Sequence, residues 1–140
     1  PLKTMETLAE IERELAACRD RVLGERIRRR QRVRQIVGDG TTSKIPVWIW
    51  RIGDAFLVGQ REEAYSVLQT KLRRWFPGHA VAVMNVVNGS CGYLPPEALY
   101  DRAVYQVRQS PYVRGSLERM IEACEGAIKR LRGAGPTVDA

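Results

Sequence analysis

Apolar residues in the first forty positions recur at intervals of three and four. They are Leu8, Ile11, Leu15, Cys18 and Val22. This spacing places them on one face of a helix. Thr7 and Glu10 form a capping box near its start, and Gly38 ends the pattern. We therefore predict one long N-terminal helix over residues 5–37, within a helical segment 1–40.

An extended hairpin is predicted to follow this helix. Residues 45–52 are rich in β-branched and aromatic side chains, which favour strands. The pair Gly53-Asp54 is a signal for a two-residue turn, and residues 55–59 supply the returning strand. A helix over residues 62–76 comes next, because apolar side chains return to helical spacing there until Pro77-Gly78.

Residues 80–87 form a nearly continuous apolar run, which is typical of a strand covered on both faces. Together with the strand at 55–59 and the helix at 62–76, this strand predicts a βαβ unit with parallel strands and a right-handed crossover. The sequence therefore predicts an α/β fold. Its small mixed sheet contains a hairpin and a right-handed βαβ unit, is covered by helices and is preceded by the long N-terminal helix.

The remainder of the chain is predicted to contain two helices and one short strand. A short helix is expected from Pro95-Pro96 through Tyr100, and the strand is expected over residues 104–107. Ser116 begins a final helix that Gly133 closes. The apolar stripe of this last helix comprises Leu117, Met120, Ile121, Cys124, Ile128 and Leu131.

The length of 140 residues fits a single domain, 1–140, and the 44% of hydrophobic residues is enough for a core. We expect residues 134–140 to be a flexible tail. Because the chain begins with Pro1 rather than Met, we expect it to be an excised piece of a larger protein or a processed product. No apolar stretch approaches the roughly 20 residues of a membrane helix, and we expect no signal peptide within these 140 residues; the compartment is left open.

The positive charge of the chain is local. There are 23 basic and 16 acidic residues, for a net charge of +7. Six of the basic residues follow one another without an intervening acid: Arg26, Arg28, Arg29, Arg30, Arg32 and Arg34. They form either a solvated or interdomain helix end, or a surface that binds nucleic acid or an anionic membrane. Nucleic acid is the less favoured partner, because no aromatic side chains are interleaved and no nucleic-acid motif is present.

Soft metal ligands are few in this sequence. Cys18, Cys91 and Cys124 are odd in number and far apart, and they match neither a disulfide framework nor zinc-finger spacing. We interpret them as small buried thiols. His79 is the single histidine; it lies beside a helix-ending turn and is interpreted as a surface residue.

Polar side chains follow both strands of the predicted βαβ unit, at the edge where ligands gather in open α/β sheets. Glu62 and Glu63 follow one strand; Asn88 and, across a loop, Tyr93 follow the other. A carboxylate at a helix N-terminus keeps a free oxygen for a metal or a proton. The alternative is that Glu62 and Glu63 only stabilise the first turn of the helix.

The same residues carry a resemblance to a known family. The run Trp50–Glu63 resembles the stretch that ends in Pro-Gly-Glu in the neutral/alkaline ceramidase family. Asn88–Tyr93 resembles that family's Asn-x-Tyr-x-x-Tyr loop, and Leu94–Tyr100 resembles the segment after it. Tyr105 falls near a further family tyrosine. The resemblance covers roughly residues 45–130, which correspond to the C-terminal part of the family's catalytic domain.

The resemblance implies a zinc-dependent amidohydrolase that cleaves the amide bond of a lipid such as ceramide. The family holds its zinc with two histidines, a glutamate and a tyrosine. Of these, the glutamate corresponds to Glu63 and the tyrosine to Tyr93. Asn88, Tyr100 and Arg61 are expected to line the site. Zinc would polarise the amide carbonyl and lower the pKa of a bound water.

Several departures from the family limit what this chain is expected to do alone. Arg61-Glu62 replaces the Pro-Gly before the glutamate, and Ser90 replaces the first tyrosine of the loop. The family's two histidines and its serine lie in an earlier segment, which this sequence lacks. Two ligands do not close a zinc site. We therefore expect this chain to carry no catalytic residue, to bind no zinc by itself and to be inactive.

Two hypotheses follow. In the first, the chain is the C-terminal portion of a ceramidase-like enzyme, and its partner is the missing N-terminal part of the catalytic domain. Glu63 and Tyr93 would then face one cleft that is open to solvent, with Glu63 solvated or paired with Arg61. In the second, the chain is a basic binding module whose arginine-rich helix end contacts nucleic acid or an anionic membrane.

Overall fold

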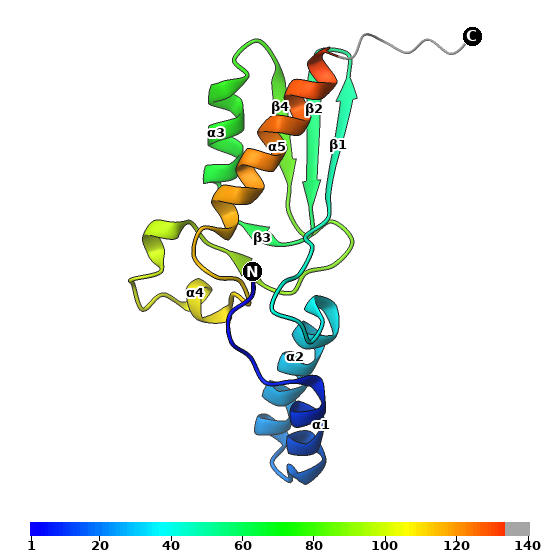
Figure 1. Cartoon of the computed structure of the whole chain (residues 1–140), viewed down its shortest axis with the longest axis vertical. Helices are drawn as coiled ribbons and strands as arrows, with labels where there is room; N and C mark the ends of the chain where they lie inside the picture. Colours follow the sequence, from blue (N-terminus) through cyan, green and yellow to red (C-terminus); the bar gives the residue numbers. More distant parts are fainter. Residues whose placement is uncertain (134–140) are drawn as a thin grey trace, which may run out of the picture.

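The computed structural model of the chain describes residues 1–133 and is elongated, with a pair of helices at one end and a helix-covered sheet at the other (Figure 1). In chain order, its elements are α1 (Leu8–Ala17), α2 (Arg21–Val37), β1 (Val47–Ile52), β2 (Ala55–Gln60), β3 (Glu63–Ala64), α3 (Val67–Trp75), β4 (Ala80–Met84), β5 (Tyr93–Leu94), the 3₁₀ helix η1 (Glu97–Leu99), α4 (Tyr105–Gln109) and α5 (Ser116–Gly133). The predicted tail, 134–140, lies outside the described residues.

A three-stranded mixed sheet, in the order β1-β2-β4, forms the centre of the molecule. β1 and β2 pair antiparallel around a tight turn at Gly53-Asp54. Gly53 adopts a φ of +58° there, a conformation that glycine reaches at little steric cost. β2 and β4 pair in parallel, and α3 crosses between them. The predicted α/β fold, with its hairpin and βαβ unit, is therefore confirmed.

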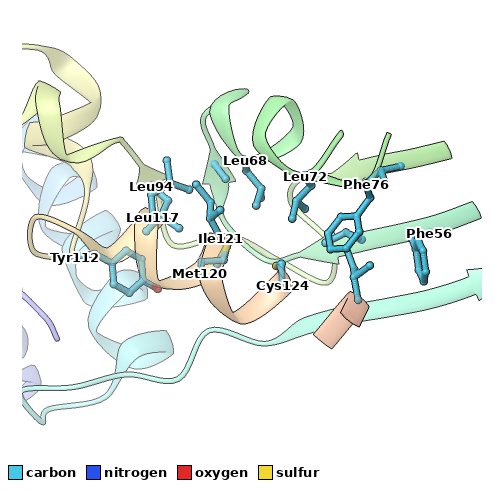
Figure 2. Packing of buried hydrophobic residues seen from close by; sticks show 14 of the residues in the cluster. Phe56, Leu68, Leu72, Phe76, Leu94, Tyr112, Leu117, Met120, Ile121 and Cys124 are labelled. Carbon is cyan, nitrogen blue, oxygen red and sulfur yellow. The ribbon is translucent and has the colours of Figure 1, made fainter. Parts of the chain in front are cut away.

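Helices α3 and α5 cover one face of this sheet (Figure 1). Alternate strand residues point to that face, where Phe56, Val58 and Val81 are buried. Leu72 and Phe76 meet them from the other side of the core (Figure 2). The stripe predicted for the last helix is confirmed. Its buried residues are Leu117, Met120, Ile121, Cys124 and Ile128.

No helix among the described residues packs on the opposite face of the sheet, which we call the open sheet face. Strand register places on it Trp48, Trp50, Ile52, Ala55, Leu57, Gly59, Ala80, Ala82 and Met84. Trp50 is 43% exposed and Ile52 66%. The interpretation of residues 80–87 as a strand covered on both faces is therefore wrong. β4 ends at Met84, and its outward side chains are exposed.

The single long helix predicted over residues 5–37 is also wrong, because the chain turns back at residues 18–20. Asp20 caps α2 by accepting a hydrogen bond from the Leu23 N–H at 2.7 Å. The turn lets α2 fold back against α1, and Ile11 and Ile27 are both buried in this pair. This burial is available to a helical hairpin but not to an isolated straight helix. The predicted capping box at Thr7 is confirmed.

Two further boundaries differ from the prediction. The helix expected over 62–76 begins only at Val67, because Glu63 and Ala64 pair as a strand with β5. The strand expected over 104–107 is the start of helix α4. Four residues are too few for periodicity to separate a strand from a helical turn. No helix in the described part of the chain is long and apolar enough to span a membrane.

The burial of the three cysteines generates a direct test of this fold. Cys124 and Cys91 are 1% and 4% exposed, whereas Cys18 lies partly exposed in the turn between α1 and α2. Burial raises the pKa of the Cys124 thiol to about 11. We expect Ellman's reagent at neutral pH to react quickly with Cys18 alone, and with all three thiols once urea unfolds the chain. Rapid reaction of a second thiol in the native chain would contradict this packing.

Candidate functional site

The candidate site lies on two short parallel strands just beyond the carboxyl end of β2. β3 and β5 pair in a register that sets Glu63 opposite Tyr93 and Ala64 opposite Leu94. The Glu63 N–H donates to the carbonyl oxygen of Gly92 at 3.0 Å. Two segments that are far apart in the sequence are thereby placed next to one another, as the prediction of parallel strands required.

Glu63 and Tyr93 lie on the same face of this strand pair. Ala64 and Leu94 are buried in the core, and successive strand residues point to opposite faces. Glu63 and Tyr93 therefore point away from the core, and both are partly exposed. The negative charge of Glu63 raises the pKa of the Tyr93 hydroxyl, and partial burial and hydrogen bonding to Glu63 add to this effect. The two oxygen-bearing groups thus lie close together, as predicted.

A second tyrosine contacts this pair. Tyr105, at the start of α4, packs edge-on against Tyr93, with 6.0 Å between ring centroids. Tyr105 is itself 53% exposed. The positions that the resemblance assigned to a glutamate and two tyrosines are therefore neighbours in space.

Glu62, next to the site, is fully buried, which the sequence did not predict. Its Oε1 accepts from Nε of Arg61 at 2.7 Å and from the hydroxyl of Tyr112 at 2.8 Å. Its Oε2 accepts from the N–H of Cys91 at 3.1 Å. The interpretation of Glu62 and Glu63 as acids in a first helical turn is wrong, because no helix begins there.

The pairing predicted for Arg61 is also different. Arg61 pairs with Glu62 instead of Glu63, and its side chain is 14% exposed. Burial alone would lower the pKa of Arg61, but the hydrogen bond and ion pair with Glu62 outweigh it and raise that pKa. Burial likewise raises the pKa of the Cys91 thiol to about 12, and the Cys91 thiol also lies against the Glu62 carboxylate. We call Arg61, Glu62, Cys91 and Tyr112 the Glu62 cluster.

The backbone around the Glu62 cluster is fixed by a buried amide. Gln60, which is fully buried, accepts from the N–H of Glu62 at 2.7 Å and donates to the Glu62 carbonyl at 2.5 Å. It also donates to Oδ1 of Asn85. On the other side, Gly92 adopts a φ of +132°, and a Cβ there would lie 2.6 Å from the carbonyl oxygen of Gln109. Both arrangements hold the segments that carry Glu63 and Tyr93.

The other residues expected to line the site do not contact Glu63 or Tyr93. Arg61 is part of the Glu62 cluster. The Tyr100 hydroxyl donates to the carbonyl oxygen of Tyr112 at 3.0 Å, and Lys3 lies over the Tyr100 ring. Asn88 is exposed in a loop with a φ of +58°. The site that the structure assembles therefore consists of Glu63, Tyr93 and Tyr105.

The donor atoms of this site fit one side of a zinc centre. A carboxylate and a phenol side by side can both coordinate a divalent cation through oxygen. The described residues contain no group of three or more His, Cys, Asp and Glu side chains that could hold a metal ion. Nδ1 of His79 donates to the Asp54 carbonyl oxygen at 2.8 Å, at the opposite end of β2, and His79 is partly buried.

The arginines of α2 occupy three different environments. Arg30 pairs with Glu6 and Glu14 of the preceding segment and α1, and Arg34 is buried beside Asp39. Arg28 and Arg29 make long, exposed pairs with Glu25. Arg26 and Arg32 are exposed and form no ion pair with the described residues. The six-residue cluster is thus not uniformly solvated, because two members stabilise the fold.

Comparison with protein-family models, with curated proteins and with solved structures finds no match to this chain.

The two adjacent glutamates provide a matched test of the Glu62 cluster. Glu62→Gln would leave the Arg61 charge without its partner in a buried setting, so we expect the free energy of unfolding to fall by about 3–5 kcal/mol. Glu63→Gln changes a partly exposed group, so we expect a change within about 0.5 kcal/mol. Urea denaturation followed by tryptophan fluorescence measures both values. Equal losses in the two variants would contradict the assignment.

Proposed function

We propose that this chain supplies the glutamate and tyrosine side of the zinc site in a ceramidase-like amidohydrolase, an enzyme that cleaves the amide bond of a lipid. One observation carries this proposal: Glu63 and Tyr93, the two positions that the sequence motifs match to the family's ligands, occupy opposed positions on neighbouring parallel strands. Their side chains lie on the same face and close enough for the charge of Glu63 to raise the pKa of Tyr93.

Each residue has a separate role in this proposal. Glu63 and Tyr93 would hold the zinc through their oxygens, and Tyr105 would fix the orientation of the Tyr93 ring. Zinc, when bound, supplies a Lewis acid for the amide carbonyl and lowers the pKa of a coordinated water. The Glu62 cluster would act on the site indirectly, because it fixes the backbone on both sides of the two ligands.

The open sheet face supports a partner that completes the domain. Trp50 and Ile52 of β1 and Met84 of β4 are exposed on it, and Leu57 of β2 is partly exposed, which is unusual for a sheet that is solvated on one side. Strands of five and six residues give this face roughly 20 Å by 14 Å, or about 300 Å². A stable interface between two separate proteins buries about 800 Å² on each. We therefore propose as its occupant the missing N-terminal part of the catalytic domain, which also supplies the histidines and the serine.

A zinc titration of the ¹⁵N-labelled chain tests the ligand assignment without requiring activity. The two ligands do not retain zinc by themselves, but excess zinc in solution contacts them transiently and shifts nearby amide resonances; we expect the shifts to centre on residues 62–65 and 92–94. Glu63→Gln combined with Tyr93→Phe should abolish these shifts. Glu122→Gln, which changes an exposed carboxyl on α5, is the matched control and should leave them unchanged. Shifts that centre on His79 or Cys18 instead would contradict the proposal.

The isolated chain is expected to fold but to have no amidase activity, because it lacks the histidines and the serine of the family. A fluorescent ceramide analogue incubated with the purified chain measures this directly, with a chelator control for contaminating metalloenzymes. Hydrolysis that persists with pure chain and responds to Glu63→Gln would show that the chain is itself an enzyme, and the proposed division of the site would then be wrong.

The coding sequence that precedes the codon for Pro1 gives the most informative further observation. The proposal expects it to encode two histidines with zinc-ligand spacing and a serine. An upstream region that encodes neither would contradict a ceramidase-like parent, even if Glu63 and Tyr93 bind zinc.

A further inference from the structure

The turn between α1 and α2 is the part of the molecule farthest from the sheet (Figure 1). We call residues 18–23 the hairpin tip. Two large aliphatic side chains, Val22 and Leu23, are adjacent there and are 59% and 46% exposed. Val22 lies on the side of α2 away from the buried Ile27. Leu23 precedes Ile27 by one helical turn on the same side, but at the hairpin tip it stays exposed. The fold does not bury these two aliphatic side chains, so a binding partner would be needed to remove them from water.

Unpaired arginines surround this apolar pair. Arg19, Arg21 and Arg26 are exposed and form no ion pair with the described residues. Residues 18–37 contain eight arginines and only two acidic residues, Asp20 and Glu25. Asp20 is used as the cap of α2. The hairpin tip is therefore both apolar and strongly positive.

The charges of the hairpin are also arranged on opposite sides. Glu14 of α1 and Glu6 pair with Arg30, and Glu12 accepts a hydrogen bond from Gln31. These acids face the inner side of α2. The arginines that remain unpaired lie at the tip and on the outer side of α2, so an anionic surface can approach them without meeting the acids of α1.

We propose that the hairpin tip and the outer side of α2 dock on an anionic lipid bilayer. Val22 and Leu23 would enter the boundary between headgroups and acyl chains, and Arg19, Arg21 and Arg26 would contact the lipid phosphates. Basic residues that flank exposed aliphatic side chains match both the charge and the apolar layer of such a surface. This docking does not depend on the zinc proposal, because it uses no residue of the candidate site.

Nucleic acid fits these observations less well. A phosphate backbone would attract the arginines, but it offers no apolar layer for Val22 and Leu23. Binding of single strands commonly adds stacking on aromatic side chains, and residues 1–40 contain no aromatic residue.

Co-sedimentation with lipid vesicles tests the proposal. The full 140-residue chain should bind vesicles of equal parts phosphatidylserine and phosphatidylcholine, and much less those of phosphatidylcholine alone. Raising the salt from about 0.1 M to about 1 M should weaken binding, because the screening length falls from about 10 Å to about 3 Å. Replacing Arg19, Arg21 and Arg26 by Gln should lower the affinity roughly a hundredfold, since each arginine near the surface contributes about a factor of five.

Two further variants separate specific docking from general charge. Replacing the exposed Arg102, Arg108 and Arg130 by Gln removes the same charge elsewhere and should change the affinity by less than about threefold. Val22→Ser with Leu23→Ser should weaken binding at least about tenfold and leave net charge unchanged. All of the changed residues are exposed, and circular dichroism verifies that each variant folds.

Several outcomes would overturn this proposal. One is equal binding to both kinds of vesicle, and another is an equal loss in the two arginine variants. Binding that Val22→Ser with Leu23→Ser does not alter would exclude insertion of the tip. Tight binding of duplex DNA in the absence of vesicle binding would assign the arginines to nucleic acid instead.

Discussion

The carboxylate of Glu62 joins three segments on which the candidate site depends. It accepts hydrogen bonds from Arg61 after β2, from the Cys91 backbone before β5, and from Tyr112 before α5. A carboxylate removed from water is costly unless its oxygens are fully used by donors. Any rearrangement of one segment would leave donors or the carboxylate unpaired, so the cluster strongly favours a single arrangement. That arrangement is the one that places Glu63 opposite Tyr93.

The same cluster fixes the segment that precedes Glu63. In the family that the sequence resembles, proline and glycine precede the glutamate, whereas Arg61 and Glu62 occupy those positions here. Both of these side chains turn into the protein and bind Cys91 or Tyr112. Side-chain hydrogen bonds therefore hold the segment extended at a place where the family motif has a tight turn. Glu63 keeps a strand conformation and an outward direction.

Much of the fold could be predicted because the elements around β2 have strong periodic signals. The hairpin at Gly53, the parallel pairing of β2 with β4 and the stripe of α5 all follow from local patterns. The turn at residues 18–20 could not be predicted from local patterns. It depends on tertiary contacts, namely the packing of Ile11 against α2 and the ion pairs of Arg30. β3 is two residues long, too short for any period. Its formation depends on pairing with a distant segment.

The candidate site was predictable to a similar extent. Parallel strands require their carboxyl ends to meet at one edge, so the proximity of Glu63 and Tyr93 follows from topology. The burial of Glu62 could not be inferred, because its partners Cys91 and Tyr112 are distant in the sequence. Tyr100 resembles a site residue by position but hydrogen-bonds to the Tyr112 backbone, since the 3₁₀ helix η1 directs it there.

The two-helix hairpin is joined to the rest of the protein only at its base. α1 and α2 pack mainly on each other, while Val37 at the end of α2 and Leu2 before α1 belong to the main core. Leu2 also pairs with Tyr112, a member of the Glu62 cluster. Matched insertions or deletions of helical turns in α1 and α2 would thus leave the sheet register unaltered. Over evolutionary time, the reach of this arm can lengthen or shorten while the sheet and its ligand-bearing edge stay constant.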